Sequence, residues 1–181
     1  MQIPFTGYAD DCTVTGELGL ETDRLSDFLA QTTEFAVSHA ALRALDDGRR
    51  VEADSLPIFR EDLCVVTASG PRGRVDRRLW TRQYPVRMKV GPYVIQGYLH
   101  APPTIDPMHC VDRRPIVALT ETILEYAAAG ERVRTQADAV LVNCRRIDTV
   151  ETATAAELGL GGHLEPDRTA DPRAKDYTAA N

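Results

Sequence analysis

The sequence predicts a mostly β protein that contains two similar small units. Three observations lead to this prediction. Short apolar and β-branched runs alternate with polar residues through most of the chain, which is typical of strands. The run around Gly16 has a counterpart around Gly97, 81 positions later. Glycine and proline clusters interrupt the pattern at intervals typical of turns.

The two halves correspond at a nearly constant spacing. The spacing is 81 for four pairs: Gly16 and Gly97, Leu18 and Leu99, Phe35 and Ile116, Leu42 and Ile123. It becomes 84 for three later pairs: Ile58 and Val142, Leu63 and Ile147, Val66 and Val150. One shift of three residues across a polar loop is what a duplication followed by a single insertion leaves. We therefore interpret the chain as a tandem duplication.

Size makes it improbable that either unit is stable alone. The chain has 181 residues and a mass of 20.0 kDa, so each unit has about 70 residues. Small domains bury a small fraction of their surface, and units of this size are close to the lower limit for independent stability. We expect the halves to support each other or a neighbouring subunit.

The first unit is predicted to span residues 1–68 and to begin with a strand at 9–20. A helix follows at 22–31, where Asp23 can cap and Leu25, Phe28 and Leu29 recur at helical spacing. Residues 35–45 predict a strand, and the Asp-Asp-Gly sequence after it predicts a hairpin turn. Residues 56–66 close the unit.

The second unit is predicted to span residues 86–152, after an arginine-rich linker at 69–85 that opens with Ser-Gly-Pro-Arg-Gly. Strands are expected at 86–90, 93–101, 116–128 and 137–150. Three prolines, at 102, 103 and 107, predict that no helix follows the second of these strands.

Residues 153–181 contain few large apolar residues, so we expect a disordered tail. The predicted core of the two units is Val14, Leu18, Phe35, Leu42, Leu63, Leu99, Ile116, Ile123, Val142 and Ile147.

Gly16 and Gly97 predict that a strand bends sharply in each unit. Glycine weakens a strand interior unless a bend or a close backbone approach requires it. In a five-stranded barrel, such a bend lets one strand serve both sheets. We therefore expect two small closed barrels, with a short helix in the first.

The second unit resembles the Sm-like fold, which belongs to the SH3-like barrels. The resemblance covers residues 86–150 and includes Val94–Leu99, which follow the pattern V-x-x-G-x-L, the middle strand 115–126 and the final segment 140–147. The first unit looks like a divergent copy, and its segment Arg24–Leu29 is similar to one in uncharacterised bacterial proteins.

Departures from the Sm pattern concern the RNA pocket. Residues 101–108 lack the aspartate and asparagine with which Sm proteins bind RNA, and Asn143–Arg146 replace the usual isoleucine-arginine-glycine sequence. The resemblance therefore implies the fold without the pocket.

The linker carries the residues that best suit a binding role. Arginine pairs with phosphates and aromatic rings stack on bases, so a nucleic-acid site is one interpretation. The alternatives are a solvated linker whose aromatic residues fill gaps between units, or a basic segment that docks on a second copy. The candidate nucleic-acid-binding residues are Arg72, Arg74, Arg77, Arg78, Trp80, Arg82 and Tyr84.

Catalytic and metal signatures are weak. His109 and Cys110, with His100 and Asp106 nearby, are zinc-ligand types, but adjacent ligands rarely face one ion. No nucleophile elbow, phosphate loop or dinucleotide fingerprint occurs. Asp10-Asp11, at the start of the first predicted strand, is an ordinary solvated pair. We expect no metal, no cofactor and no enzymatic activity.

Charge and cysteine spacing point to a cytoplasmic protein. The net charge of −6 argues against general nucleic-acid binding. No apolar run approaches the length of a membrane span, and there is no secretion signal at the N-terminus. The four cysteines lack C-x-x-C spacing and are expected to be free, with Cys110 in a loop.

We conclude from the sequence that the chain is a non-enzymatic assembly or protein-interaction module, partnered by itself or by another protein. RNA or single-stranded nucleic-acid binding through the linker is the first alternative. A small-molecule-binding or enzyme accessory subunit is the second.

Overall fold

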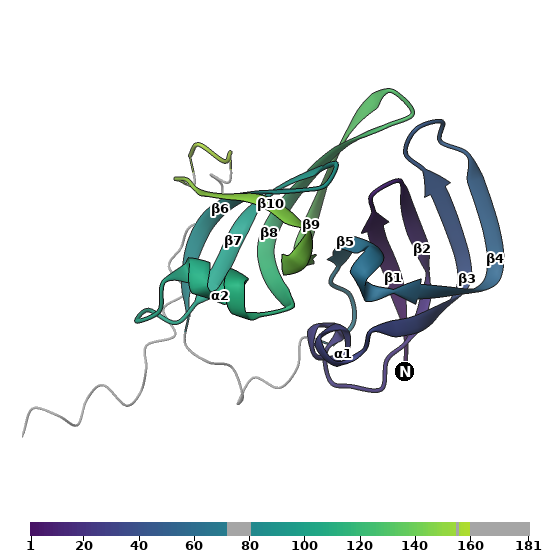
Figure 1. Cartoon of the computed structure of the whole chain (residues 1–181), viewed down its shortest axis with the longest axis horizontal. Coiled ribbons are helices and arrows are strands. Elements are labelled where there is room, and N and C mark those ends of the chain that lie inside the picture. Colours follow the sequence, from purple (N-terminus) through teal and green to yellow (C-terminus); the bar gives the residue numbers. More distant parts are fainter. Residues whose placement is uncertain (72–80, 155, 160–181) are drawn as a thin grey trace, which may run out of the picture.

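The computed structural model describes residues 1–71, 81–154 and 156–159 (Figure 1). The described chain is mostly β. The first half contains β1 (Gln2–Ala9), β2 (Cys12–Gly19), α1 (Leu25–Gln31), β3 (Glu34–Ala44), β4 (Arg50–Phe59), the 3-10 turn η1 (Arg60–Asp62) and β5 (Leu63–Thr67). The second contains β6 (Arg82–Val90), β7 (Tyr93–Ala101), α2 (Pro107–Arg113), β8 (Ile116–Ala128), β9 (Glu131–Asn143), η3 (Cys144–Arg146) and β10 (Ile147–Thr152).

The same order of elements thus occurs in both halves, which we call the first unit (β1 to β5) and the second unit (β6 to β10). All ten strands join one open antiparallel sheet, in the order β10-β6-β7-β8-β9-β5-β1-β2-β3-β4. The sequence predicts two closed barrels, but β5 pairs with β1 and with β9 of the other unit, not with β4. The two units therefore meet edge to edge through β5 and β9.

Two strand boundaries differ from the prediction. Residues 2–8 belong to β1, which the sequence did not indicate because Pro4 and Gly7 interrupt its alternation of apolar and polar residues. Asp10-Asp11 consequently lie in the turn between β1 and β2 rather than at the start of a strand. The predicted strand 137–150 is divided by η3 into β9 and β10.

The prediction that no helix follows residue 101 is wrong, because α2 begins at Pro107. Proline is well tolerated at the first helical position, where its missing N–H would have no partner within the helix. Asp106 caps this helix by accepting a hydrogen bond from the backbone N–H of Met108, at 2.9 Å. Cys110 is therefore buried in a helix, not placed in a loop.

The two mid-strand glycines lie at matching irregularities of the sheet. A Cβ on Gly16 would lie 2.6 Å from the carbonyl oxygen of Ser38, and one on Gly97 would lie 3.0 Å from that of Thr120. The register shifts there in both units, beside His39 and Glu121, whose φ values are 49° and 51°. Glycine is required because the backbone of the next strand approaches too closely for a side chain.

Strand pairing also refines the spacing between the units. Val14 pairs with Leu42, and its counterpart Ile95 pairs with Leu124, which is 82 residues after Leu42. The predicted match of Leu42 to Ile123 is therefore wrong by one residue. The spacing of 84 agrees with the register of β4 and β9, since Ser38 pairs with Ser55 and Thr120 with Ala139.

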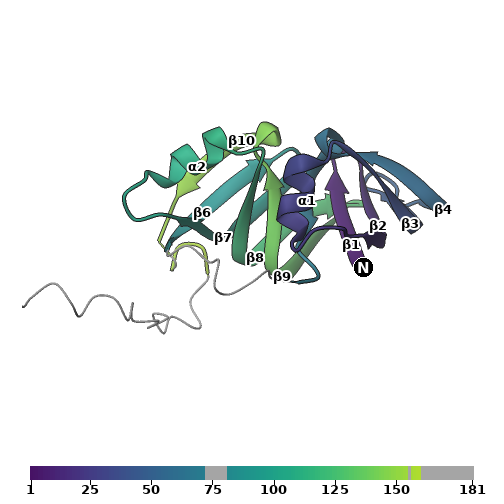
Figure 2. The ribbon, with the colours of Figure 1, turned by 90° about the horizontal axis from the view of Figure 1, so that it is seen from below.

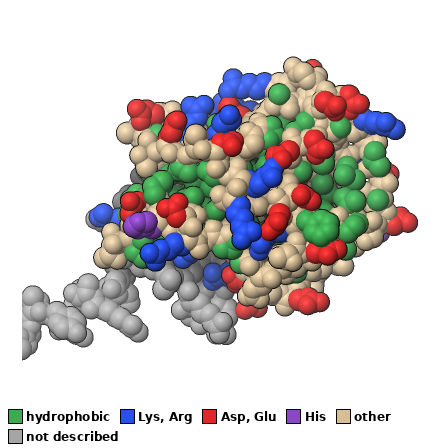
Figure 3. Space-filling view, viewed as in Figure 1, with side chains coloured by type: hydrophobic (Ala, Val, Ile, Leu, Met, Phe, Trp, Pro, Cys, Tyr) green, Lys and Arg blue, Asp and Glu red, His purple; other side chains and the backbone are tan. Residues whose placement is uncertain are grey.

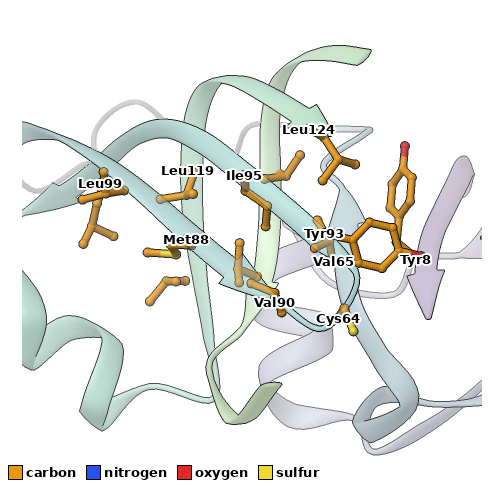
Figure 4. Close-up of a cluster of buried hydrophobic side chains, with 14 of the residues drawn as sticks. Tyr8, Cys64, Val65, Met88, Val90, Tyr93, Ile95, Leu99, Leu119 and Leu124 are labelled. Carbon is orange, nitrogen blue, oxygen red and sulfur yellow. The ribbon is translucent and has the colours of Figure 1, made fainter. Parts of the chain in front are cut away.

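Each unit has its own hydrophobic core, and β5 contributes to both. Val65 packs in the core of the second unit, whereas its neighbour Val66 packs in that of the first. Tyr8 of β1 also enters the second core, where it makes an edge-to-face contact with Tyr93, with ring centroids 5.5 Å apart (Figure 4). Of the ten predicted core residues, all are buried except the half-buried Leu42, Ile116 and Ile147.

Candidate strand-docking site at the sheet edge

The pairing of β5 with β9, which we call the internal junction, shows how one unit accepts a strand from the other. Val65 pairs with Val142, Val66 with Leu141 and Thr67 with Val140. The backbone N–H of Ala68 donates to the carbonyl of Ala139, at 3.0 Å. Antiparallel pairs alternate between hydrogen-bonded and non-hydrogen-bonded types. The backbone N–H and C=O of Leu141 therefore point toward Val66.

Asn143 completes this junction just beyond the last paired residue of β9. Its side chain is buried and donates to the carbonyl oxygens of Arg60, at 3.2 Å, and Leu63, at 3.0 Å. Its Oδ1 accepts from the backbone N–H of Arg145, at 3.2 Å. Since a buried carbonyl without a donor is costly, one amide satisfies polar groups from both units.

Two ion pairs follow Asn143 across the junction. Arg145 contacts Glu61 at 2.9 Å, with both side chains more than half exposed, and Arg146 contacts Asp10. Exposed pairs stabilise a fold little, so their main effect is on register. Glu61 and Arg145 are themselves counterparts, 84 residues apart, each in the 3-10 turn of its unit.

Helix α1 closes the junction on one side. The buried guanidinium of Arg60 donates to the carbonyl oxygens of Leu29, at 3.0 Å, and Ala30, at 3.3 Å. These carbonyls lie at the C-terminal end of α1, where a helix lacks internal donors and favours positive charge. Leu25 and Leu29 share the first core with Leu141 of β9. In the first unit, the space between helix and closing strand is thus occupied by the second unit.

In the second unit the counterpart of β5 is β10, whose other edge has no strand partner among the described residues. The N–H of Ala153 donates to the carbonyl of Pro85, at 3.2 Å, so Thr152 and Val86 form a non-hydrogen-bonded pair. The same alternation makes Val150 and Met88 a pair of this type. The backbone N–H and C=O groups of Val150 and Thr152 therefore face the open edge.

A groove of about 760 Å³ runs along this edge between β10, η3 and the end of α2. Figure 2 shows α2 beside β10 and α1 beside the β9 and β1 region. We call this space the β10 groove. It is lined by four arginines and two aspartates, in a chain whose net charge is −6, together with apolar and small side chains. The charged lining residues are Arg60, Arg113, Arg114, Arg145, Asp112 and Asp148.

The opposite edge of the sheet, β4, has different chemistry. The N–H of Arg60 donates to the carbonyl of Thr33, at 2.8 Å, which makes Ala36 and Pro57 a non-hydrogen-bonded pair. The nitrogen of Pro57 therefore faces the open edge and offers no donor there. Proline in this orientation is typical of edge strands that remain unpaired. Phe59, at the end of this strand, is 51% exposed.

The predicted nucleic-acid residues are only partly within the described chain. Arg72, Arg74, Arg77, Arg78 and Trp80 lie outside the described residues. Arg82 and Tyr84 belong to β6 rather than to a linker, and pair with Ala101 and Leu99. Figure 3 shows acidic and basic side chains interspersed over the visible face, without a continuous basic surface.

The histidine and cysteine candidates have structural partners. Nε2 of His100 lies 2.8 Å from Oγ1 of Thr120, and burial lowers the pKa of His100 below its ordinary 6.5. His109 and Cys110 lie on α2. In the described ranges no three or more His, Cys, Asp or Glu side chains are grouped to hold a metal ion.

The thiols are poorly suited to nucleophilic chemistry. Burial raises the pKa of Cys12, Cys64 and Cys144 to about 11 in each case. A thiolate rather than a thiol is the nucleophile, so these groups are inert at neutral pH. All four cysteines are free. No helix within the part of the chain that the structure describes is long and apolar enough to cross a membrane.

Comparison of the chain with protein-family models, with curated proteins and with solved structures finds no match. The candidate site therefore stands on its own geometry. Sequence reasoning did not single out β10, α2 or the groove between them. Its one available signal was Asn143–Arg146, which it recorded only as a departure from the Sm pattern.

Proposed function

We propose that this chain is a non-enzymatic protein-interaction module whose β10 edge accepts an extended strand from another protein molecule. The observation that carries the proposal is the internal junction, in which the counterpart strand β5 accepts β9. At β10 the corresponding edge is open and lies beside a groove. Free strand edges are either protected or used for pairing.

The repeated order of elements supports descent of both units from one duplicated ancestor that paired through its edges. Each unit then corresponds to a small bent sheet of the Sm-like or SH3-like kind, opened so that β5 pairs outward. Edge pairing of this type gives binding through backbone hydrogen bonds, while side-chain pockets supply specificity. We place such a module in the cytoplasm.

The test uses a fluorescent peptide with the sequence of residues 139–145, altered by Cys144→Ser and by Arg145→Gln to leave the charge neutral. Binding to the full chain is measured by fluorescence anisotropy. We expect saturable binding that the variant Thr152→Pro weakens by about fivefold, because proline removes one backbone donor from the open edge. Thr152 is exposed and does not bond to β6 through this N–H, so the fold is retained.

The matched control is Thr152→Val, which has a similar shape and keeps the N–H; it should bind as the natural chain does. Equal affinity for the proline and valine variants, or no saturable binding, would exclude β10 as a docking edge. Light scattering on nuclease-treated protein reports in parallel whether copies of the chain associate.

A further inference from the structure

We infer that the strand accepted at β10 comes from a different protein and has a defined character: apolar residues, then asparagine, then an acidic residue two positions later. The inference rests on the proposed function of β10 as a docking edge. It goes further by stating which side chains the partner carries and why a second copy of this chain is a poorer occupant.

The backbone requirement comes from Val150. In the internal junction, Leu141 of β9 directs its N–H and C=O at Val66, which is the counterpart of Val150. A strand in the β10 groove must therefore carry a residue other than proline at that point. The counterpart of Leu141 on β4 is Pro57, so a second copy's β4 would leave the carbonyl of Val150 without a donor.

The amide requirement comes from the turn that precedes the docking strand. Asn143 donates to the carbonyls of Arg60 and Leu63, which begin η1 and β5. Their counterparts, Cys144 and Ile147, begin η3 and β10 and line the β10 groove. A partner asparagine would supply the same two donors. On β4 this position is Phe59, which has no donor in its side chain.

The acidic requirement comes from an exchange of charge between counterparts. In the internal junction the incoming Arg145 contacts Glu61 of the receiving unit. In the β10 groove the receiving residue is Arg145 itself, with Arg113 and Arg114 also in the lining. Opposite charges across an interface favour the correct partner and oppose the wrong one. An acidic residue two positions after the asparagine would therefore face Arg145.

A second copy's β4 satisfies only the last of these three requirements, through Glu61. It lacks the backbone donor because of Pro57 and the amide because of Phe59. Burial of the exposed ring of Phe59 would partly offset these losses. A partner with all three features forms more hydrogen bonds in the groove and is therefore preferred.

The experiment compares five labelled peptides for binding to the natural full-length chain by anisotropy. Three carry residues 139–145 with Cys144→Ser and end in Glu, Gln or Arg at the position of Arg145. The fourth is the Glu peptide with Leu141→Pro, and the fifth carries residues 55–61 of β4. We expect the Glu peptide to bind about fivefold more tightly than the Arg peptide, and both the proline and β4 peptides to bind about fivefold more weakly than the Glu peptide.

The variant Arg145→Glu of the full chain is the matched control, because it should reverse the preference between the Glu and Arg peptides. Equal binding of all five peptides would overturn the inference and leave the docking edge intact. Tightest binding by the β4 peptide would overturn it in favour of a second copy. If no peptide binds, both the inference and the proposed function fall.

Discussion

Strands β9 and β4 occupy corresponding places in the two units, yet only β9 is paired on its outer side. The backbones follow the same order, and the register of each with its inner neighbour corresponds. The difference lies in side chains at the outer edge, where Leu141 corresponds to Pro57 and Asn143 to Phe59. Whether an edge is paired or open is thus decided by a few groups and not by the fold.

The largest expected effect comes from exchanging the residues that distinguish the two edges. Leu141→Pro removes a backbone donor directed at Val66 and a buried side chain, 3% exposed, from the first core. We expect the free energy of unfolding to fall by more than about 3 kcal/mol. Urea unfolding followed by circular dichroism measures it.

The reverse exchange, Pro57→Leu, is the control. It should change the unfolding free energy by less than about 1 kcal/mol, because the nitrogen of Pro57 faces solvent and not β3. A comparable loss in both variants would show that the two edges are energetically alike, contrary to the comparison.

Asn143 sharpens the comparison at a single side chain. Asn143→Leu leaves the carbonyls of Arg60 and Leu63 without their side-chain donor, so we expect a loss of about 2–3 kcal/mol. Thermal unfolding by calorimetry measures it. Phe59→Asn, at the corresponding exposed position, should shift the unfolding free energy by no more than about 0.5 kcal/mol. A stable Asn143→Leu variant would mean that the amide does not hold the units together.

The glycines test whether the two units tolerate the same change equally. A Cβ on Gly16 would lie 2.5 Å from Cγ1 of Val37, closer than the 2.7 Å between a Cβ on Gly97 and Cγ2 of Thr122. We expect Gly16→Ala to cost about 2 kcal/mol and Gly97→Ala somewhat less, because the neighbours must move apart. Gly19→Ala, with its nearest neighbour 3.9 Å away, should be neutral. Denaturant midpoints that rank the three variants otherwise would contradict these contacts.

The smallest effect concerns pH and a contact found only in the second unit. Burial lowers the pKa of His100, so the unfolded chain binds a proton more readily than the folded chain. His100 therefore lowers stability as the pH falls below its ordinary pKa of 6.5, and the loss stops growing below the folded-state pKa.

The variant His100→Gln should lose this dependence, by less than about 1 kcal/mol. Unfolding free energies of both proteins between pH 7.5 and about pH 5 give the difference. Parallel curves would show that His100 titrates alike in both states.

Local pattern was sufficient for much of the fold. The apolar alternation located most strands, and the two mid-strand glycines marked the register shifts. It failed at α2, where Pro107 reads as a helix breaker although it occupies the first helical position. It also failed at β1, where Pro4 and Gly7 interrupt the pattern, because tertiary pairing there outweighs local propensity.

The candidate site was beyond sequence reasoning for a different reason. Asn143, Glu61 and Arg145 are ordinary polar residues whose meaning depends on which strand lies opposite, across more than 80 positions of chain. The residues that did stand out were the arginines of the linker. Their chemistry is visible in one dimension, whereas a sheet edge becomes a site only when its neighbour is known.

The sequence by itself determined the β class, the two similar units, the free cysteines and most of the core, because burial and strand pairing leave periodic traces within a few residues. Only the tertiary structure decided that the units join through β5 and β9 into one open sheet. Pairing between distant strands uses backbone groups that every residue possesses. The sequence therefore carries little record of which edges meet, and the packing of complete units selects them.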